Sequence, residues 1–246
     1  MLKIEHLTKT YGGMPAVQDL CLHIRPGELC AFIGHNGAGK TTTLKCCCGI
    51  QQFDAGEIYV DGEKIKIKNI AQQIKNGFAL VPEDRQAEGL VQTLDIEKNI
   101  SLSSLKTCCN KFVLSKKKED EYVDAQIKDI HIKVADKNLP ILSLSGGNQQ
   151  KCVIGKGVLT DPKILLMDEP SRGIDIGAKT EVFDIINQYA DRGLSIICVS
   201  SELKEMLAIA NRVVVLSNGI KTAEFTDDEI TEDNLVLASY KGHHTN

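Results

Sequence analysis

The sequence predicts an α/β protein built on a mainly parallel β-sheet flanked by helices. In the second half of the chain, short apolar runs alternate with amphipathic stretches of helical length, which is typical of parallel strands joined by crossover helices. A polar stretch from about 95 to 135 has helical character without strand signals, which indicates a helical insertion. The predicted elements of the second half are strands at 164–167, 194–199 and 212–216 and helices at 177–191 and 202–210.

Strand signals dominate the N-terminal part of the chain. Residues 2–7 alternate between apolar and polar side chains, and residues 20–24 do so again, which predicts half-buried strands. Residues 28–33 are mostly apolar, as in a strand buried on both faces. Turn signals separate or follow the strands: Gly12-Gly13, Asp61-Gly62 after a strand at 57–60, and Asn218-Gly219 after the strand at 212–216.

Length, charge and hydropathy argue against several classes of protein. A chain of 246 residues can bury a full core, and its net charge of −4 gives no support for a nucleic-acid partner. The three lysines at 116–118 are followed directly by three acidic residues, which indicates a solvated helix. No stretch approaches the roughly 20 apolar residues that span a bilayer, and the first residues do not resemble a signal peptide. We therefore expect a cytoplasmic protein that meets a membrane only through a partner.

Nine cysteines raise the question of a metal site or disulfides. None of them forms a C-x-x-C pair, and no histidine sits at zinc-ligand spacing beside them. We interpret them as reduced thiols that fill space like small hydrophobic side chains. The pair His243-His244 lies in a polar tail, where a frayed terminus explains it better than a metal site.

The segment 34–41 carries the firmest chemical signal. It fits the pattern G-x-x-x-x-G-K-[ST] and lies between a predicted buried strand and a helix. Its glycines allow consecutive backbone N–H groups to point at phosphate oxygens, and the following helix presents its positive end to the same anion. Lys40 is expected to reach the β- and γ-phosphates, and the Thr41 hydroxyl to coordinate Mg²⁺. The motif predicts Mg-ATP binding by Gly34, His35, Asn36, Gly37, Ala38, Gly39, Lys40, Thr41 and Thr42.

An acidic pair, Asp168-Glu169, follows the apolar run at 164–167. A carboxylate at the carboxyl end of a parallel strand lies where ligands of open α/β sheets bind. Asp168 is suited to the Mg²⁺ shell, and Glu169 to polarising an attacking water. Alone, such a pair also fits an ordinary strand that ends in a polar turn, and the phosphate loop upstream is what favours function.

A third motif, Leu144-Ser145-Gly146-Gly147, could by itself be a turn or a helix N-cap. Placed shortly before an Asp-Glu strand, it resembles the signature of ATP-binding cassette (ABC) ATPases. In that family the signature serine and glycines of one cassette close on the γ-phosphate held by another. The resemblance therefore implies that Ser145, Gly146 and Gly147 bind nucleotide and that the partner is a second cassette, identical or different.

The resemblance covers essentially the whole chain and implies one domain, 1–246. The implied fold is a P-loop NTPase with a RecA-like mainly parallel sheet, an N-terminal antiparallel β subdomain and a helical subdomain inserted at about 84–156. Tyr11 matches an aromatic residue that stacks on adenine in the family, although a half-buried strand tyrosine is the alternative. Residues 171–175 resemble the family's D-loop, which would place Asp175 near the dimer seam.

Within the family the resemblance is strongest to ATPases of sugar importers of the ribose and galactose type. Those importers usually fuse two cassettes, and this chain resembles the second. The implied function is ATP hydrolysis that powers transmembrane permease subunits importing a monosaccharide or similar small polar solute, with the chain on the inner face of the membrane. A soluble cassette of DNA repair or translation fits less well, because of the acidic balance and the lack of long coiled-coil arms. The segments that carry the sugar-importer resemblance are 81–85, 144–151, 168–175 and 199–203.

Two positions depart from the common family pattern. Glu83 replaces a glutamine that touches Mg²⁺ and the attacking water, and its carboxylate could still be a Mg²⁺ ligand. Ser201 replaces a histidine that contacts the γ-phosphate. Two interpretations stay open. One is an ATPase, slowed by both replacements, in which Glu169, Lys40 and Ser201 are catalytic. The other is a hydrolysis-impaired regulatory cassette paired with a more active one.

Overall fold

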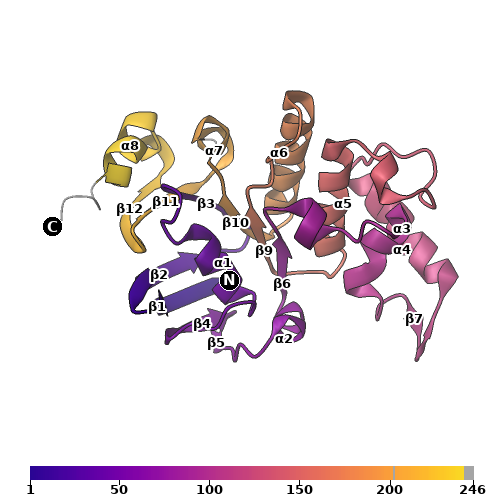
Figure 1. Cartoon of the computed structure of the whole chain (residues 1–246), viewed down its shortest axis with the longest axis horizontal. Coiled ribbons are helices and arrows are strands. Elements are labelled where there is room, and N and C mark those ends of the chain that lie inside the picture. Colours follow the sequence, from indigo (N-terminus) through magenta and orange to yellow (C-terminus); the bar gives the residue numbers. More distant parts are fainter. Residues whose placement is uncertain (202, 241–246) are drawn as a thin grey trace. The chain divides into compact units, whose positions relative to one another are not determined.

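The computed structural model describes residues 1–201 and 203–240, and the tail histidines His243 and His244 lie outside these ranges (Figure 1). The chain divides into two compact units. Unit 1 comprises Met1–Leu80, Lys163–Glu169 and Ile186–Asn246, and unit 2 comprises Val81–Pro162 and Pro170–Ile185.

Unit 1 is organised around a six-stranded sheet with the strand order β12-β11-β3-β10-β9-β6. Parallel pairing joins β3 to β10 and β11 and joins β10 to β9, whereas β12 is antiparallel to β11. The predicted mainly parallel sheet is therefore confirmed. Every residue of β3, β9 and β10 is buried, as expected of strands covered on both faces. The strands are β3 (Leu29–Ile33), β6 (Phe78–Val81), β9 (Ile164–Asp168), β10 (Ser195–Val199), β11 (Arg212–Ser217) and β12 (Ile220–Thr226).

A second sheet in unit 1 has the order β2-β1-β4-β5 and is antiparallel, as predicted for the N-terminal part. The strict alternation predicted for residues 2–7 is wrong at one position. Ile4 pairs with Leu22 but Leu7 pairs with Leu20, so β1 carries a bulge between them that turns His6 outward. The strands are β1 (Leu2–Tyr11), β2 (Met14–Ile24), β4 (Ala55–Val60) and β5 (Glu63–Lys64).

The hydrophobic core of unit 1 joins both sheets to α1 through buried side chains such as Leu22, Phe32 and Leu44. Figure 1 shows α7 and α8 on the opposite side of the six-stranded sheet from β1 and β2. All nine thiols are free, and the seven buried ones match their interpretation as space-filling groups, whereas Cys21 and Cys109 are partly exposed. Burial raises the pKa of Cys46 to about 11, so this thiol stays protonated near neutral pH. The helices are α1 (Lys40–Cys47), α2 (Ile70–Lys75), α7 (Leu203–Ile209), α8 (Glu232–Tyr240) and the short turn η4 (Asp227–Glu229).

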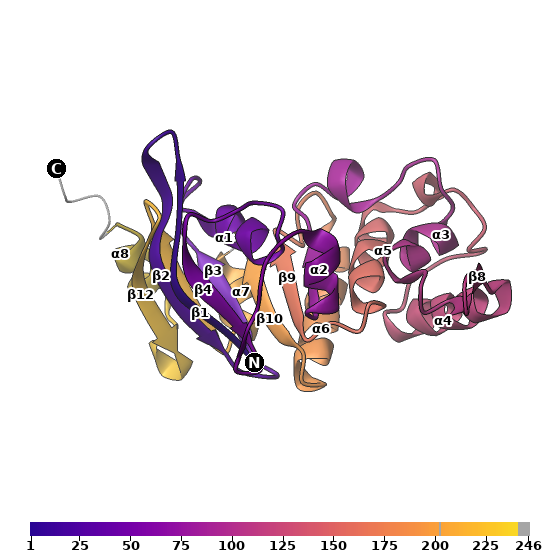
Figure 2. The same ribbon diagram turned by 90° about the horizontal axis from the view of Figure 1, so that it is seen from below.

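Unit 2 is mainly helical, with α3 packed against α4 and α5 (Figure 2). The prediction that 95–135 holds no strand is wrong, because β7 and β8 form a small hairpin there. Its two-residue turn, Lys111-Phe112, has Lys111 at φ 57° and contains no glycine, asparagine or aspartate that would have signalled it. The elements are η1 (Arg85–Gly89), α3 (Ile96–Ser101), η2 (Leu102–Ser104), β7 (Cys109–Asn110), β8 (Val113–Leu114), α4 (Lys116–Asp129), η3 (Ile141–Ser143), α5 (Gly146–Val158) and, shared with unit 1, α6 (Ile176–Asp191).

The boundaries of the inserted subdomain stay a prediction. The expected range of about 84–156 falls inside the first segment of unit 2, Val81–Pro162, and unit 2 also includes Pro170–Ile185. Among the described residues, no helix combines the length and the apolar character needed to cross a membrane.

Candidate functional site

The loop between β3 and α1 has a backbone that only glycine allows at two positions. Gly34 and Gly39 have φ of 154° and 97°. A Cβ on Gly34 would lie 2.0 Å from the carbonyl oxygen of Leu216, and one on Gly39 would lie 2.3 Å from that of Ala16. Gly37, at φ 83°, faces open space. The chain thus curls tightly against its own neighbours while its outer side stays accessible, as a phosphate-binding loop requires.

Lys40 lies at the start of α1 with its side chain folded back over this loop. Its ammonium donates hydrogen bonds to the carbonyl oxygens of Gly34 and His35, at 2.6 and 3.1 Å. Burial lowers the pKa of Lys40 even though the carboxylates of Glu169 and Asp168 oppose this shift. Within the described residues no side chain caps the first turn of α1, which leaves its amides available to an anion. The buried Lys40 ammonium and the first-turn amides of α1 thus lie together at the start of this helix, where an anion can bind.

Asp168 ends β9 and is 3% exposed. Burial raises the pKa of Asp168, and a hydrogen bond with the Thr41 side chain partly opposes this. The Oδ1 atom of Asp168 is buried without a hydrogen-bond partner in the described residues. A buried carboxylate oxygen lacking a partner, next to a hydroxyl, matches the hard oxygen ligands that Mg²⁺ prefers. The residues present therefore fit a Mg²⁺ ion.

Glu169 follows Asp168 and adopts the left-handed conformation at φ 47°. Its amide donates to the carbonyl oxygen of Val199 at 2.9 Å, which ties it to the end of the neighbouring strand β10. The Ser201 amide and hydroxyl both donate to Oε2 of Glu169, at 2.9 and 3.0 Å. Ser201 is predicted to be catalytic, at the position where most cassettes have a histidine that contacts the γ-phosphate, and that role stays a prediction. In this structure its hydroxyl donates to the predicted catalytic carboxylate, a contact that sequence reasoning missed.

Tyr11 ends β1 at the turn that leads into β2 and is 48% exposed. The Lys9 ammonium lies 5.2 Å from the centre of its ring. An exposed ring at a strand end is available for stacking, and the role of Tyr11 in binding adenine stays a prediction.

The signature segment lies in unit 2 at the start of α5. Ser145 is the N-cap of that helix and accepts a hydrogen bond from the Asn148 amide at 3.4 Å. A Cβ on Gly147 would lie 2.4 Å from Cβ of Ala178, so this glycine is needed for packing inside unit 2. The N-cap interpretation thus describes what Ser145 does within the chain, and binding to a nucleotide held by another cassette stays a prediction.

An arginine that received no role from the sequence links two loops of unit 2. Arg85 donates from Nη1 to the Arg172 carbonyl oxygen at 2.8 Å and from Nη2 to that of Gly173 at 3.1 Å. A Cβ on Gly146 would lie 2.9 Å from the same guanidinium. Arg85 therefore lies between the signature segment and the D-loop-like segment. The sequence places Arg85 in the 81–85 segment but does not reveal its partners, because they lie about 87 residues further along the chain.

Glu83 pairs with the guanidinium of Arg172 in unit 2. Its predicted role as a Mg²⁺ ligand is untested and stays a prediction. The predicted site residues fall into two groups. Unit 1 holds the loop 34–41 with Thr42, together with Tyr11, Asp168, Glu169 and Ser201, and unit 2 holds Glu83, Ser145, Gly146 and Gly147.

Comparison with known proteins places these motifs in a family. The family model described as "ABC transporter" matches residues 17–172. A ribose import ATP-binding protein of Oceanobacillus iheyensis is 40% identical over 225 residues, covering 92% of this chain and 45% of that protein. A xylose import ATP-binding protein of Moorella thermoacetica is 41% identical over 227 residues, with coverage of 92% and 45%. The chain thus spans about half the length of the curated relatives it matches.

Solved structures confirm the fold. A nucleotide-free ATP-binding cassette of an ABC transporter superposes with a TM-score of 0.85 at 21% identity, covering 100% of this chain and 99% of that one. A cassette in a dimeric post-hydrolysis state, bound to ADP and Pi, gives a TM-score of 0.80 at 22% identity, with coverage of 92% and 98%. The predicted P-loop NTPase architecture is correct, and the chain belongs to the ABC transporter family.

Proposed function

We propose that this chain binds Mg-ATP and hydrolyses it to drive an ABC importer. The observation that carries the proposal is the carboxyl edge of β9 and β10. There Oδ1 of Asp168 is buried without a hydrogen-bond partner in the described residues, and the next residue is Glu169, whose carboxylate accepts hydrogen bonds from Ser201. Lys40, whose pKa both carboxylates influence, belongs to the same group. In this proposal Lys40 binds phosphate, Asp168 is a metal ligand and Glu169 is a positioned general base.

In the proposed reaction the loop amides and Lys40 bind the β- and γ-phosphates. Asp168 and Thr41 hold Mg²⁺, which supplies charge neutralisation on the phosphate oxygens when bound. Glu169 accepts a proton through Oε1 from a water that attacks the γ-phosphorus. The bond between that phosphorus and the β,γ-bridging oxygen breaks, and ADP and phosphate leave. Ser201 keeps Oε2 of Glu169 fixed, so Oε1 faces the water.

The proposed partners are a second cassette and transmembrane permease subunits on the inner face of the membrane. In this scheme Ser145, Gly146 and Gly147 complete the site of the second cassette. The names of the relatives, ribose and xylose import ATP-binding proteins, support a monosaccharide as the solute. Because those relatives are about twice as long, the second cassette can be a separate copy or another segment. Uptake of labelled ribose and xylose by cells expressing the chain with its permease would test the solute.

Phosphate release by the purified chain tests the enzymatic part. Glu169→Gln should lower turnover on the order of 10²–10⁴-fold while ATP affinity stays within a factor of two or so, because the base is lost and the grip is not. Glu121→Gln, on the exposed face of α4, is the matched control and should leave both quantities unchanged. Tight ATP binding with turnover insensitive to Glu169→Gln would contradict hydrolysis at this site and support a regulatory cassette.

A second pair of variants tests Ser201. Ser201→Ala removes one of the two hydrogen bonds to Glu169 and should lower the turnover number several-fold without changing ATP affinity. Ser201→His restores the residue that most cassettes have and should raise turnover if the serine slows hydrolysis. If the wild-type chain already matches an efficient cassette and Ser201→His has no effect, slow hydrolysis is wrong.

A further inference from the structure

Three side chains with metal-binding atoms meet on β1 and β2, and none of them has a role in the proposed nucleotide site. They are His6, Asp19 and Cys21, and their ligand atoms all lie within 4.8 Å of one another. Nδ1 of His6 is 2.6 Å from Oδ1 of Asp19 and 3.8 Å from Sγ of Cys21. A nitrogen, an oxygen and a sulfur ligand therefore converge on one small volume.

Two complementary bulges create this cluster. The register changes from Ile4 opposite Leu22 to Leu7 opposite Leu20, which leaves His6 as the extra residue of β1. It then changes back before Lys9 pairs with Val17, which leaves an extra residue on β2 next to Asp19. Without the bulge in β1, period-2 alternation from Leu2 and Ile4 would turn His6 towards the core face. The bulge instead directs His6 onto the solvent face, on which Asp19 and Cys21 lie two residues apart on β2.

The backbone conformation around the cluster accommodates these bulges. His6 and Asp19 both adopt the left-handed conformation, at φ 53° and 51°. On the neighbouring strand β4, Gly56 leaves room for the displaced chain, since a Cβ there would lie 2.7 Å from Cα of Leu7. The Asp19 amide donates to the Thr8 hydroxyl at 3.0 Å, which fixes the second bulge. The His6 amide donates to Sγ of Cys21 at 3.3 Å, which holds this sulfur beside the bulge.

We propose that His6, Asp19 and Cys21 form a binding site for a zinc-type divalent cation, with water as the fourth ligand. In a tetrahedral site with the usual bond lengths, the nitrogen and sulfur ligands lie about 3.6 Å apart, close to the separation found here. The Asp19 oxygen must move away from His6 by about 0.7 Å, which replaces their hydrogen bond with two metal bonds. The side chains of His6 and Asp19 are 73% and 70% exposed, so the cation has a path from solvent.

The chemistry of the ligands selects the cation. A thiolate and an imidazole favour Zn²⁺ and its neighbours Co²⁺, Ni²⁺ and Cu²⁺ over Mg²⁺ and Ca²⁺, which need several oxygen ligands. The site is thus distinct in kind from the oxygen ligands of Asp168 and Thr41. Sequence spacing did not reveal it, because His6 and Cys21 are 15 residues apart and are brought together only by antiparallel pairing. Bound metal would clamp β1 to β2 near the hairpin that carries Tyr11.

Co²⁺ titration of the whole reduced chain, without nucleotide, tests the proposal. Cobalt bound by a thiolate gives an intense near-ultraviolet charge-transfer band that all-oxygen sites cannot give. We expect about one equivalent of this band, displaced by Zn²⁺, abolished in Cys21→Ser and weakened at least tenfold in affinity in His6→Gln. Asp168→Asn should leave the band unchanged, because that site contains no sulfur.

Two control variants exclude other sources of the band. Cys109→Ser removes the other partly exposed thiol, and the double variant His243→Ala/His244→Ala removes the tail histidines, which lie outside the described residues. Both should keep the band. Zn²⁺ should also raise the Tm of the wild-type chain and not of Cys21→Ser. Absence of the band from the wild type, or its persistence in a folded Cys21→Ser protein, would overturn the proposal.

Discussion

Two buried carboxylates, Glu97 in unit 2 and Asp168 in unit 1, differ in whether a cation pairs with them. Glu97 in unit 2 is 1% exposed and forms ion pairs with Lys116 and with Lys137, the latter at 3.2 Å. Asp168 in unit 1 is 3% exposed, its pKa is raised by burial, and its Oδ1 has no partner in the described residues. Oε1 of Glu97 also has no hydrogen-bond partner in the described residues, but two lysine ammonium groups compensate the charge of this carboxylate. Because an ionised carboxylate is costly to bury unless it is paired, Glu97 is compensated, whereas Asp168 forms no ion pair within the described residues.

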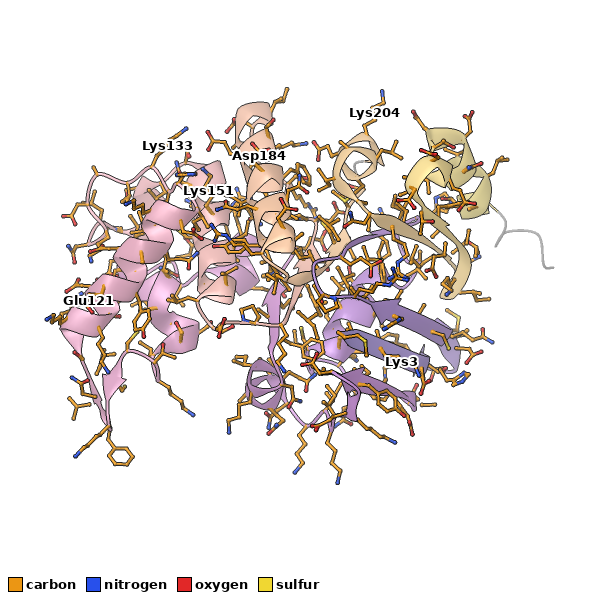
Figure 3. All side chains as sticks on the ribbon, turned by 180° about the vertical axis from the view of Figure 1, so that it is seen from behind. Lys3, Glu121, Lys133, Lys151, Asp184 and Lys204 are labelled. Atoms are coloured by element: carbon orange, nitrogen blue, oxygen red, sulfur yellow. The ribbon has the colours of Figure 1, made fainter. Side chains whose placement is uncertain are left out.

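Two buried lysines show the same contrast. Lys151 is 1% exposed and pairs with Glu181, which Lys133 also contacts at 2.7 Å. Figure 3 labels Lys133 and Lys151 in unit 2. Lys40 is 7% exposed, donates hydrogen bonds within the described residues to backbone carbonyl oxygens alone, and has a pKa that burial lowers. Unit 2 thus uses buried charge to hold its helices together. In unit 1, Asp168 and Lys40 are buried without such ion pairs in the described residues, and we propose that a ligand compensates their charges.

The largest expected effect comes from making Glu97 resemble Asp168. The double variant Lys116→Met/Lys137→Met leaves the Glu97 carboxylate buried without a cation, which should lower the free energy of unfolding by about 3–5 kcal/mol. Urea unfolding followed by circular dichroism measures this. Lys117→Met is the matched control, because Lys117 is 87% exposed and contacts Glu121 only at 4.0 Å. A loss below about 1 kcal/mol would mean that water reaches Glu97 and that the contrast is wrong.

A second prediction removes the uncompensated charge. Asp168→Asn keeps the shape but should lower Mg-ATP hydrolysis on the order of 10²-fold, because a metal ligand is lost. The same change should raise the Tm of the nucleotide-free, Mg²⁺-free chain at neutral pH. In the wild type the folded-state pKa of Asp168 is raised above its usual value of 3.8, so folding disfavours the ionised form. Tm measurements across pH therefore provide a direct check.

The sign of the pH dependence follows from the raised pKa. Above the folded-state pKa, Asp168 is ionised in both states and the full penalty is present, so Asp168→Asn gains its largest advantage. As the pH falls through the folded-state pKa towards 3.8, the wild-type carboxyl takes up its proton in the folded state and the advantage disappears. A constant difference in Tm across this range, or a lower Tm of Asp168→Asn at neutral pH, would contradict the assignment.

The phosphate loop and the parallel strands could be predicted because their signals are local. Gly34 and Gly39 must be glycine for reasons of backbone contact, and β3 and β9 are buried on both faces, so sequence and structure coincide there. The acidic pair at 168–169 follows a local apolar run, but its function could be inferred only together with the phosphate loop upstream. The loop and the strands each need only a short segment to be recognised.

Features that depend on contacts between distant segments were missed. The contact between Ser201 and Glu169 spans 32 residues, and the contacts of Arg85 span 87 and 88 residues. The bulges in β1 and β2 arise from pairing between strands, so the apolar alternation of residues 2–7 could not reveal them. The hairpin at β7 and β8 lacks a turn residue that sequence rules recognise. In each case the deciding partner lies outside the local window.

The smallest expected effect concerns Arg85, whose guanidinium donates to backbone carbonyl oxygens and not to a carboxylate in the described residues. Arg85→Lys replaces the two-pronged contact with the Arg172 and Gly173 carbonyl oxygens by a single ammonium, which should cost about 1–2 kcal/mol of stability. Amide exchange at 172–175 should become faster, because the loop loses one anchor. Arg172→Lys, which keeps an ion pair with Glu83, is the control and should cost no more than about 1 kcal/mol. If amide exchange at 172–175 is unchanged in Arg85→Lys, the hydrogen bonds of Arg85 do not stabilise this loop. The stabilising role of charged groups in unit 2 would then be limited to its buried ion pairs.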